Sequence, residues 1–463
     1  MSMIAARLER MPFARVHRQL LLMGGLGYTF DGMDGAIVAF VLPALSSLWA
    51  LTSVEIGVLA SANFIGYLVG AFCAGNFGDL IGRRRVMMWA LAIFCLASLV
   101  TAFATSWRMF FWWRILAGVG TGAESAIVAP FLSEFVASRY RGKFIGALAG
   151  FFSFGFLGAA ILGRLLVPAA SWGWQVAIVI TALPIVMLLW WRRALPESPR
   201  WLETRGRIQE AEVIVEKFEQ AIEKELGRPL PAPAADTAQA PRPVSKGTLF
   251  SNLRALWSPG LARVTAMTWL VWLSITFCYY AFFSWIPSLM VKNGLTITKS
   301  FNYSIAIYAA QVPGYYSAAF LNERFGRQAV ISVYMVLGGL SAIVLSLTRD
   351  NLVIMIAGVC LSFFMNGTYA GLYAYTPELF PTEVRATGMG VASSIGRIGA
   401  ISAPIIVGYV FPWAGFAGVF GMTTVVLLAG AVSVLVLGVH TRGKSLEQIA
   451  VEELGGTRKG AKA

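Results

Sequence analysis

Five ionisable side chains interrupt apolar stretches that are long enough to cross a lipid bilayer. They are Asp31, Asp34, Arg114, Glu124 and Arg397. Charged groups are costly in the hydrocarbon core of a membrane, and those found there generally serve the movement of ions, protons or substrates. The chemistry that we expect from these five residues is therefore proton transfer and ion pairing.

Asp31 and Asp34 are candidates for proton transfer. They are three residues apart, so they lie about one turn apart on roughly one face of a helix. Two carboxylates this close do not both ionise cheaply in a medium of low dielectric constant, so at least one is expected to hold a proton. His17 and His440 lie at the two ends of the apolar part of the chain. A proton carried through the core must therefore be bound to a carboxylate.

Glu124 is the third acidic candidate. It follows Arg114 by ten residues, which is about 15 Å along a helix axis. Glu124 is therefore expected in a different layer of the membrane from Arg114. Two interpretations stay open: Glu124 is a second titrating site, or its carboxylate is hydrogen-bonded to backbone.

Arg397 is the fixed cation of the C-terminal half. Small residues surround it in the sequence, among them Gly396, Gly399 and Ala400. A guanidinium binds a carboxylate through two parallel hydrogen bonds. The predicted spans of this half contain no acid, so we expect a carboxylate substrate as the counter-ion. Backbone carbonyls and water are the alternative.

Aromatic and amide side chains recur at helical spacing in three predicted spans of the same half. Such stripes usually serve packing or interface anchoring. Tyrosine hydroxyls in mid-span beside Gln and Asn are less easily explained by packing, and together they can stack a flat ring and hydrogen-bond a heteroatom. With Arg397, the predicted substrate-binding residues are Trp272, Tyr279, Tyr280, Gln311, Asn366, Tyr369 and Tyr373.

The composition requires a membrane protein to hold these residues. Of 463 residues 57% are hydrophobic and 13% are charged, and the mean hydropathy is +0.69, whereas about 25% of a soluble domain is charged. Each span must be helical, because lipid offers the backbone no hydrogen-bond partner. The sequence thus predicts an all-α polytopic membrane protein with twelve transmembrane helices. They cover about 19–45, 57–77, 86–105, 109–133, 143–167, 173–191, 264–289, 303–321, 329–347, 352–376, 386–411 and 416–438.

The net charge of +14 would suggest nucleic acid as the partner of a soluble protein, but the charge distribution indicates a membrane instead. If the N-terminus is cytoplasmic, the outside loops hold four of the 37 Lys and Arg residues, namely Arg108, Lys292, Lys299 and Arg349. This positive-inside pattern predicts that both termini are cytoplasmic. No phosphate-binding loop, nucleophile–base pair or metal-ligand cluster occurs in the sequence. We therefore expect no nucleic-acid partner, no enzymatic activity, no cofactor and no metal.

Two charged motifs recur 244 residues apart. Asp79 and Arg83 return as Glu323 and Arg327, while Glu134 and Arg141 return as Glu378 and Arg385. Two coincidences at one offset indicate a six-span half written twice, as in many secondary transporters. Opposite charges at the cytoplasmic rim are predicted to latch the two bundles shut and to release when they rock. The alternative is a set of solvated loop charges worth about 0–1 kcal/mol.

The chain is expected to comprise four parts. These are an N-terminal six-helix bundle over 1–191, a cytoplasmic linker over 192–263, a C-terminal six-helix bundle over 264–438 and a cytoplasmic tail over 439–463. Within the linker, acids and bases alternate at helical spacing over 205–226 and predict a surface helix. The prolines of 229–243 predict a flexible tether.

Four motifs resemble the signature set of the major facilitator superfamily, in its sugar-porter-like and metabolite:proton symporter branch. They are Gly78-Asp-Leu-Ile-Gly-Arg-Arg-Arg, Arg114-Ile-Leu-Ala-Gly-Val-Gly-Thr-Gly122, Pro196-Glu-Ser-Pro-Arg-Trp-Leu202 and Pro377-Glu-Leu-Phe-Pro-Thr-Glu-Val-Arg-Ala-Thr-Gly388. The match runs over nearly the whole chain. It implies the major facilitator fold, a monomer in the bacterial inner membrane, and Asp34 opposite Arg114. Asp34 is accordingly the first choice for the proton carrier, and a permanent Asp34–Arg114 ion pair is the structural alternative.

Further motifs narrow the branch. Phe30-Asp-Gly-Met-Asp34 and Gly122-Ala-Glu124 look less like sugar porters than like aromatic-acid symporters and organic-ion transporters. Another four are similar to bacterial niacin (nicotinate) transporters: Phe277-Cys-Tyr-Tyr280, Gln311-Val-Pro-Gly-Tyr-Tyr-Ser-Ala-Ala319, Leu372-Tyr-Ala-Tyr-Thr-Pro-Glu378 and Gly396-Arg-Ile-Gly399.

The expected function is proton-coupled uptake of a small aromatic monocarboxylate, with nicotinate first. The alternatives are a symporter for benzoate-type acids, an organic cation or anion transporter, and a transporter-like nutrient sensor. An organic cation suits the three buried acids but leaves Arg397 unexplained. Sensors of this kind usually carry long cytoplasmic tails, and the tail here is short.

Overall fold

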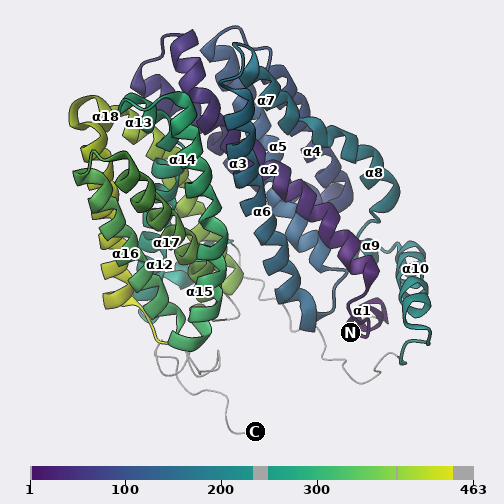
Figure 1. The fold of residues 1–463 in the computed structure, drawn as a ribbon. Helices are drawn as coiled ribbons and strands as arrows, with labels where there is room; N and C mark the ends of the chain where they lie inside the picture. The colour runs from purple at the N-terminus through teal and green to yellow at the C-terminus, as the bar shows by residue number, and fades with distance from the viewer. Residues whose placement is uncertain (1–2, 233–248, 382–383, 442–463) are drawn as a thin grey trace. The chain divides into compact units, whose positions relative to one another are not determined.

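The computed structural model describes residues 3–232, 249–381 and 384–441, and every regular element in these ranges is helical (Figure 1). The predicted all-α fold is confirmed. The chain divides into two compact units. The first comprises Met1–Ala44 and Ala62–Arg242, and the second comprises Leu45–Ser61 and Pro243–Ala463.

Eleven elements lie between the N-terminus and the gap at residue 233. They are α1 (Met3–Glu9), α2 (Arg15–Leu48), α3 (Ser53–Ile81), α4 (Arg83–Thr101), α5 (Trp107–Ser133), α6 (Ser138–Leu166), α7 (Gly173–Thr181), the 3-10 helix η1 (Leu183–Val186), α8 (Met187–Ala194), α9 (Pro199–Thr204) and α10 (Ile208–Leu226). Element α10 is the helix expected over 205–226. The tether expected over 229–243 lies mostly outside the described residues.

Eight helices follow in the C-terminal part of the chain. They are α11 (Leu249–Leu256), α12 (Ala262–Phe283), α13 (Ile286–Lys292), α14 (Ile297–Ala309), α15 (Gln311–Phe325), α16 (Arg327–Leu347), α17 (Asn351–Glu378) and α18 (Arg385–Leu437). The last of these is interrupted at Gly415, whose φ of 61° and ψ of −161° are not helical. Most of the tail expected over 439–463 lies beyond the last described residue.

Ten of the described helical segments are long and apolar enough to cross a membrane. Two features account for the difference between this count and the twelve predicted spans. The span expected over 303–321 is divided into α14 and α15, because Pro313 has no N–H to donate to the carbonyl of Ala309. The spans expected over 386–411 and 416–438 both lie in α18, and the non-helical Gly415 divides this element between them.

Capping residues explain where several of these helices begin. The side chain of Ser106 accepts a hydrogen bond from the Met109 N–H at the start of α5, and Asp350 accepts from Leu352 and Val353 at the start of α17. Gly82 and Gly326 precede α4 and α16 with φ of 101° and 90°, which few residues other than glycine adopt. These positions recur at the 244-residue offset, so the repeat extends to the helix ends.

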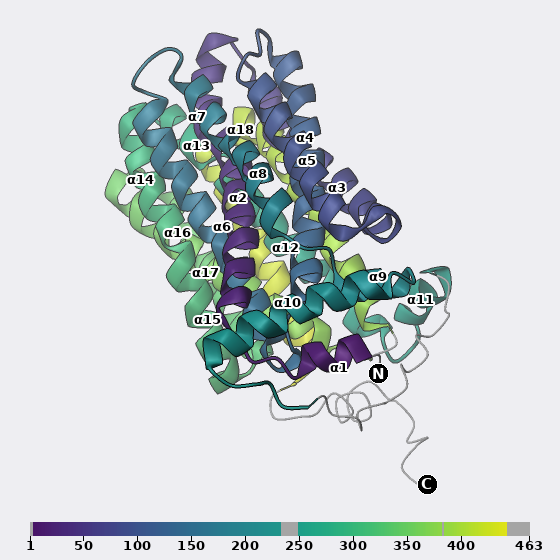
Figure 2. The same cartoon turned by 90° about the vertical axis from the view of Figure 1, so that its right-hand side faces the viewer.

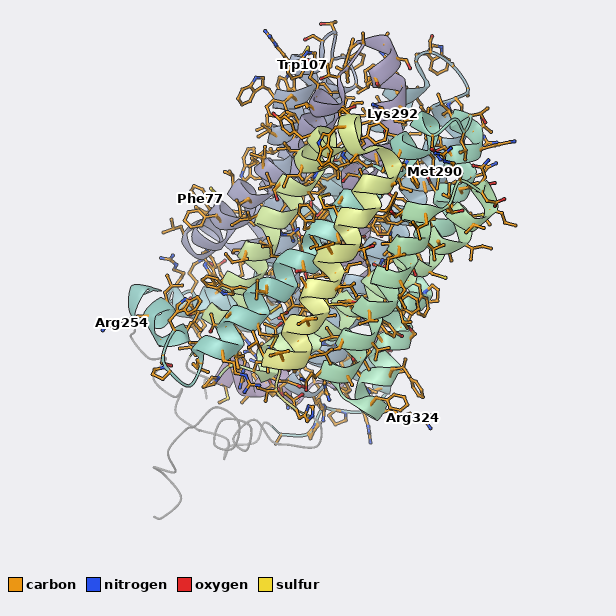
Figure 3. All side chains as sticks on the ribbon, turned by 90° about the vertical axis from the view of Figure 1, so that its left-hand side faces the viewer. Phe77, Trp107, Arg254, Met290, Lys292 and Arg324 are labelled. Carbon is orange, nitrogen blue, oxygen red and sulfur yellow. The ribbon has the colours of Figure 1, made fainter. Side chains whose placement is uncertain are left out.

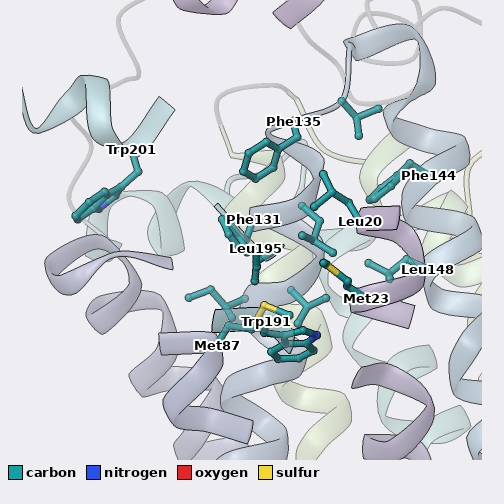
Figure 4. Close-up of a cluster of buried hydrophobic side chains, with 14 of the residues drawn as sticks. Leu20, Met23, Met87, Phe131, Phe135, Phe144, Leu148, Trp191, Leu195 and Trp201 are labelled. Carbon is teal, nitrogen blue, oxygen red and sulfur yellow. The ribbon is translucent and has the colours of Figure 1, made fainter. Parts of the chain in front are cut away.

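The first unit has one large buried apolar cluster that spans several helices. Met23 of α2, Met87 of α4, Phe131 of α5 and Trp191 of α8 lie close together in it (Figure 4). Because its members come from helices that are distant in the sequence, this cluster fixes the packing around the buried charges.

Helix α1 packs against α9 and α10 at one end of the first unit (Figure 2). Arg7 and Arg10 each form an ion pair of 2.6 Å with Glu219 of α10. Burial alone would raise the pKa of Glu219, but the hydrogen bonds from these two guanidinium groups lower it below its ordinary value. Helix α1 could not be predicted from the sequence, because seven residues are too few for a periodic signal.

The second unit includes a short piece of the N-terminal half, Leu45–Ser61. The Ser61 hydroxyl donates to the Ile401 carbonyl at 2.8 Å, and Lys292 Nζ lies 2.9 Å from Ser53 Oγ. Within this unit Met290 and Lys292 lie at one end, and Arg254 and Arg324 lie at the opposite end (Figure 3). Cations therefore mark both ends of the unit, while its helical interior is largely apolar.

Candidate functional site

Asp34 and Arg114 form a buried bidentate ion pair between α2 and α5. The Arg114 Nη1–Asp34 Oδ1 distance is 2.9 Å and the Nη2–Oδ2 distance is 2.8 Å, and both side chains are fully buried. The hydroxyls of Ser98 and Thr181 donate to Asp34 Oδ1 at 2.8 and 2.9 Å. This geometry is that of the structural ion pair considered as the alternative role for Asp34.

The two hydroxyl donors to Asp34 were not predicted from the sequence. Ser98 lies on α4 and Thr181 on α7, and neither stands in a motif. Only the fold brings them to α2. Serine and threonine in mid-span are too common to identify such a contact from one sequence.

Asp31 and Glu124 form a second buried acidic site in the same unit. Asp31 is 4% exposed and Glu124 is fully buried. Both oxygens of each carboxyl lack a hydrogen-bond partner within the described ranges. The interpretation that the Glu124 carboxylate is hydrogen-bonded to backbone therefore finds no support in this geometry.

Glycines explain how α5, which carries Arg114 and Glu124, packs closely against α3 and α4. A Cβ on Gly66 or Gly70 of α3 would lie 1.9 Å from a backbone carbonyl of α5, and one on Gly118 would lie 2.1 Å from the Asn63 carbonyl of α3. Gly120 instead faces α4, where a Cβ would meet Phe94. The glycine motif after Arg114 thus allows two close helix contacts, as small residues do in membrane proteins.

An aromatic cluster occupies the second unit. We use this term for Trp272, Tyr279, Tyr280, Tyr369 and Tyr373 of α12 and α17. Tyr279 and Tyr369 meet edge to face with ring centroids 5.3 Å apart, and Trp272 and Tyr373 do so at 5.1 Å. The Tyr369 hydroxyl donates to Thr276 Oγ1 at 2.8 Å. Five of the predicted substrate-binding residues are thus brought together.

Gln311 of α15 joins the aromatic cluster through a hydrogen bond. The Tyr279 hydroxyl donates to Gln311 Oε1 at 3.2 Å. Gln311 is 1% exposed, and its Nε2 has no hydrogen-bond partner among the described residues. Burying an unsatisfied donor costs about 1–3 kcal/mol, so this amide is poised to donate to an acceptor that enters the cluster.

Arg397 and Asn366 differ in their relation to the aromatic cluster. Arg397 is half-buried on α18 and interacts electrostatically with Tyr369. The preceding residue, Gly396, faces α12, since a Cβ there would lie 3.0 Å from Thr276 Oγ1. Asn366 donates from Nδ2 to the Ser362 carbonyl of its own helix. One of the two N–H groups of Asn366 is therefore used within α17, and its role in substrate binding stays a prediction.

The duplicated rim charges form one ion pair in each unit. Arg83 pairs with Glu134, which also accepts from the Ser198 hydroxyl, and Arg327 pairs with Glu378 at 3.1 Å. Each of these ion pairs is closed within one unit.

The other rim charges fall into three groups. Arg141 and Arg385 each donate to a backbone carbonyl, Val136 and Phe380 respectively, again at the 244-residue offset. Glu323 is exposed, and the side chain of Asp79 lies outside the described part of the structure.

The sequence pattern of the sugar (and other) transporter family matches residues 24–452. The chain belongs to this family of the major facilitator superfamily. It is 39% identical to the niacin transporter NiaP of Acinetobacter baylyi over 97% of this chain and 100% of that protein. It is 35% identical to the putative niacin/nicotinamide transporter NiaP of Bacillus subtilis, with 93% and 98% of the two chains covered.

The fold also matches a solved transporter. The partially occluded inward-open xylose transporter XylE from E. coli superposes with a TM-score of 0.73 at 17% identity, covering 93% of this chain and 100% of that one. With the helices described above, this likeness confirms the predicted twelve-helix major facilitator fold. The protein is a multi-pass membrane transporter. Within the described ranges no group of three or more His, Cys, Asp or Glu side chains is arranged to hold a metal ion.

Proposed function

We propose that this transporter imports nicotinate together with protons by alternating access of its two six-helix bundles. The observation that carries the proposal is the buried Nε2 of Gln311, which has no hydrogen-bond partner among the described residues and belongs to an amide bound to the aromatic cluster through its oxygen. A pyridine ring offers a flat face to the aromatic side chains and a ring nitrogen that accepts a hydrogen bond from Nε2. Benzoate has the same shape but lacks that acceptor.

Arg397 supplies the second element of recognition. Its guanidinium lies near Tyr369 and can bind the nicotinate carboxylate through both terminal nitrogens. Nicotinamide keeps the ring but presents a neutral amide, which offers the guanidinium no negative charge to bind. The names of the two bacterial relatives, a niacin transporter and a putative niacin/nicotinamide transporter, agree with a pyridine substrate.

Thermal stabilisation of the purified protein tests this proposal. The ligands to compare are nicotinate, nicotinamide, benzoate and choline. A ligand that binds only the folded protein stabilises it by about 2.7 kcal/mol at a hundred times its Kd. We expect nicotinate to raise the melting temperature most and benzoate less, with little effect of nicotinamide and none of choline. Equal shifts for nicotinate and nicotinamide would overturn the role of Arg397, and a shift with choline alone would favour an organic-cation transporter.

The membrane location, the orientation of the termini and the oligomeric state belong to the same proposal. We infer that both termini lie in the cytoplasm, which the positive-inside distribution of Lys and Arg supports. We also infer a monomer in the bacterial inner membrane. The rim ion pairs Arg83–Glu134 and Arg327–Glu378 each stabilise the cytoplasmic end of their own bundle. Rocking of the bundles then alters the surroundings of these pairs without touching the substrate site.

A further inference from the structure

Asp34 and the pair formed by Asp31 and Glu124 differ in how their charge is compensated. Asp34 is bound by Arg114 and two hydroxyls. Protonating Asp34 would leave the guanidinium buried without its counter-ion, which typically costs several kcal/mol. Asp34 is therefore suited to remain ionised throughout transport.

Asp31 and Glu124 have no such partners. Neither carboxyl accepts a hydrogen bond in the described part of the chain, and both are more than nine-tenths buried. A buried carboxylate without donors is costly, whereas the protonated acid is neutral and tolerated. The geometry therefore favours the protonated form of these two groups.

The two carboxyls lie on the same face of α2: Asp31 belongs to this helix, and Glu124 contacts it from α5. A Cβ on Gly27 would lie 2.3 Å from Glu124 Oε1, so the Glu124 carboxyl lies directly against the α2 backbone. Asp31 follows Gly27 by four residues and is therefore on the same face, one turn further along. The Asp31 and Glu124 groups also interact electrostatically.

Among the described residues, the groups around Asp31 and Glu124 include no cation that is available to pair with them. Asp34 of α2 and Cys95 of α4 interact with Asp31. Tyr67 of α3 donates its hydroxyl to Ser125, next to Glu124, and Arg114 of α5 is bound to Asp34. Trp191 of α8, which contacts the Gly27 position, has an indole N–H without a hydrogen-bond partner (Figure 4).

We propose that Asp31 and Glu124 together bind the transported proton, while Asp34 and Arg114 form a permanent ion pair that holds α2 against α5. This proposal rests on the proposed proton-coupled transport. The proton is held as an O–H on one of the two carboxyls and is released to water when the conformational change admits water to the pair. No other bond changes.

Transport in proteoliposomes tests the pair. One pH unit supports about tenfold accumulation of substrate for each coupled proton. With this gradient imposed, we expect wild-type protein and the surface control Glu216→Gln to concentrate nicotinate. Glu124→Gln and Asp31→Asn should lose this accumulation but keep nicotinate exchange within about twofold, because an amide cannot titrate. Normal accumulation by both variants would overturn the proposal, as would wild-type accumulation driven by sodium instead of protons.

Infrared difference spectroscopy of the full-length protein, without substrate, separates this proposal from the proposed function. A pH step should change the band of a protonated carboxyl in wild type and in Glu216→Gln, and Glu124→Gln should remove or shift it. The same band in Glu124→Gln and Asp31→Asn as in wild type would refute the pair even if the variants fail in transport. If the band depends on the pair but wild type neither binds nor accumulates nicotinate, the proton site stands and the substrate assignment falls.

Discussion

The two halves of the chain correspond closely at their helix ends and differ inside their helices. Helix α4 begins at Arg83 and α16 at Arg327, while α5 and α17 begin at Trp107 and Asn351, all 244 residues apart. The backbone follows the same offset in its turns, since Ala50 and Gly294 both have positive φ. The ends of the helices must meet water and reverse direction in the same way in both halves.

The interior positions have diverged. The residues 244 positions after Asp31, Asp34, Arg114 and Glu124 are Ile275, Cys278, Gly358 and Thr368. In the reverse direction, Tyr279, Tyr369 and Arg397 correspond to Gly35, Ser125 and Ser153. One framework thus carries buried acids in its first half and aromatic rings in its second. If the first half binds the proton and the second half binds the aromatic ring, the two halves need different residues at these positions, which would explain why the repeat is lost there.

The largest effect is expected from breaking the ion pair of the first half. Arg114→Met leaves Asp34 buried without its cation and should cost about 3–5 kcal/mol of stability. Thermal unfolding of the detergent-purified variant measures this loss. Arg397→Met is the matched control in the second half and should lose far less stability. Similar losses in both variants would show that Arg114 and Arg397 serve the same structural purpose.

Arg397 should instead determine the affinity for the carboxylate. Arg397→Lys keeps the charge but loses the bidentate fork, so we expect nicotinate to bind about 10–100-fold more weakly. Equilibrium binding of radiolabelled nicotinate measures this change, with nicotinamide as the second ligand. An unchanged Kd for nicotinate in Arg397→Lys would remove Arg397 from the substrate site.

Gln311 is expected to set the preference for a ring nitrogen. Gln311→Leu removes the buried donor, so the preference for nicotinate over benzoate should fall about tenfold, as for one hydrogen bond to a substrate. Competition binding of the two acids checks this. Tyr67→Phe changes the corresponding position of the first half and should leave the preference as in wild type. A retained preference in Gln311→Leu would place the discrimination elsewhere.

The smallest effects on stability are expected at the rim, where the halves still match. Arg83→Gln and Arg327→Gln each remove a partly exposed ion pair worth about 0–1 kcal/mol. We expect both variants to bind nicotinate normally and to transport it more slowly, because the pairs affect the conformational equilibrium. Measuring both the Kd and the initial uptake rate distinguishes an effect on binding from an effect on transport. Parallel losses of binding and uptake would assign these pairs to folding instead.

The sequence by itself determined the class and the repeat of this protein. Twelve apolar stretches require twelve helices in lipid, and charged motifs at one offset locate their ends. The same motifs carry the family resemblance. The buried ionisable residues could also be identified from sequence, because a charge is conspicuous in an apolar stretch.

Only the tertiary structure decided which of these groups are partnered. Asp31 and Asp34 are three residues apart and look alike in the sequence, yet Arg114, Ser98 and Thr181 surround only Asp34. The partners come from α4, α5 and α7. Helix α5 packs so closely against α4 that a Cβ on Gly120 would lie 2.5 Å from the Phe94 backbone nitrogen. Hydrogen bonds between distant helices depend on distances of a few tenths of an ångström, which periodicity and composition do not contain.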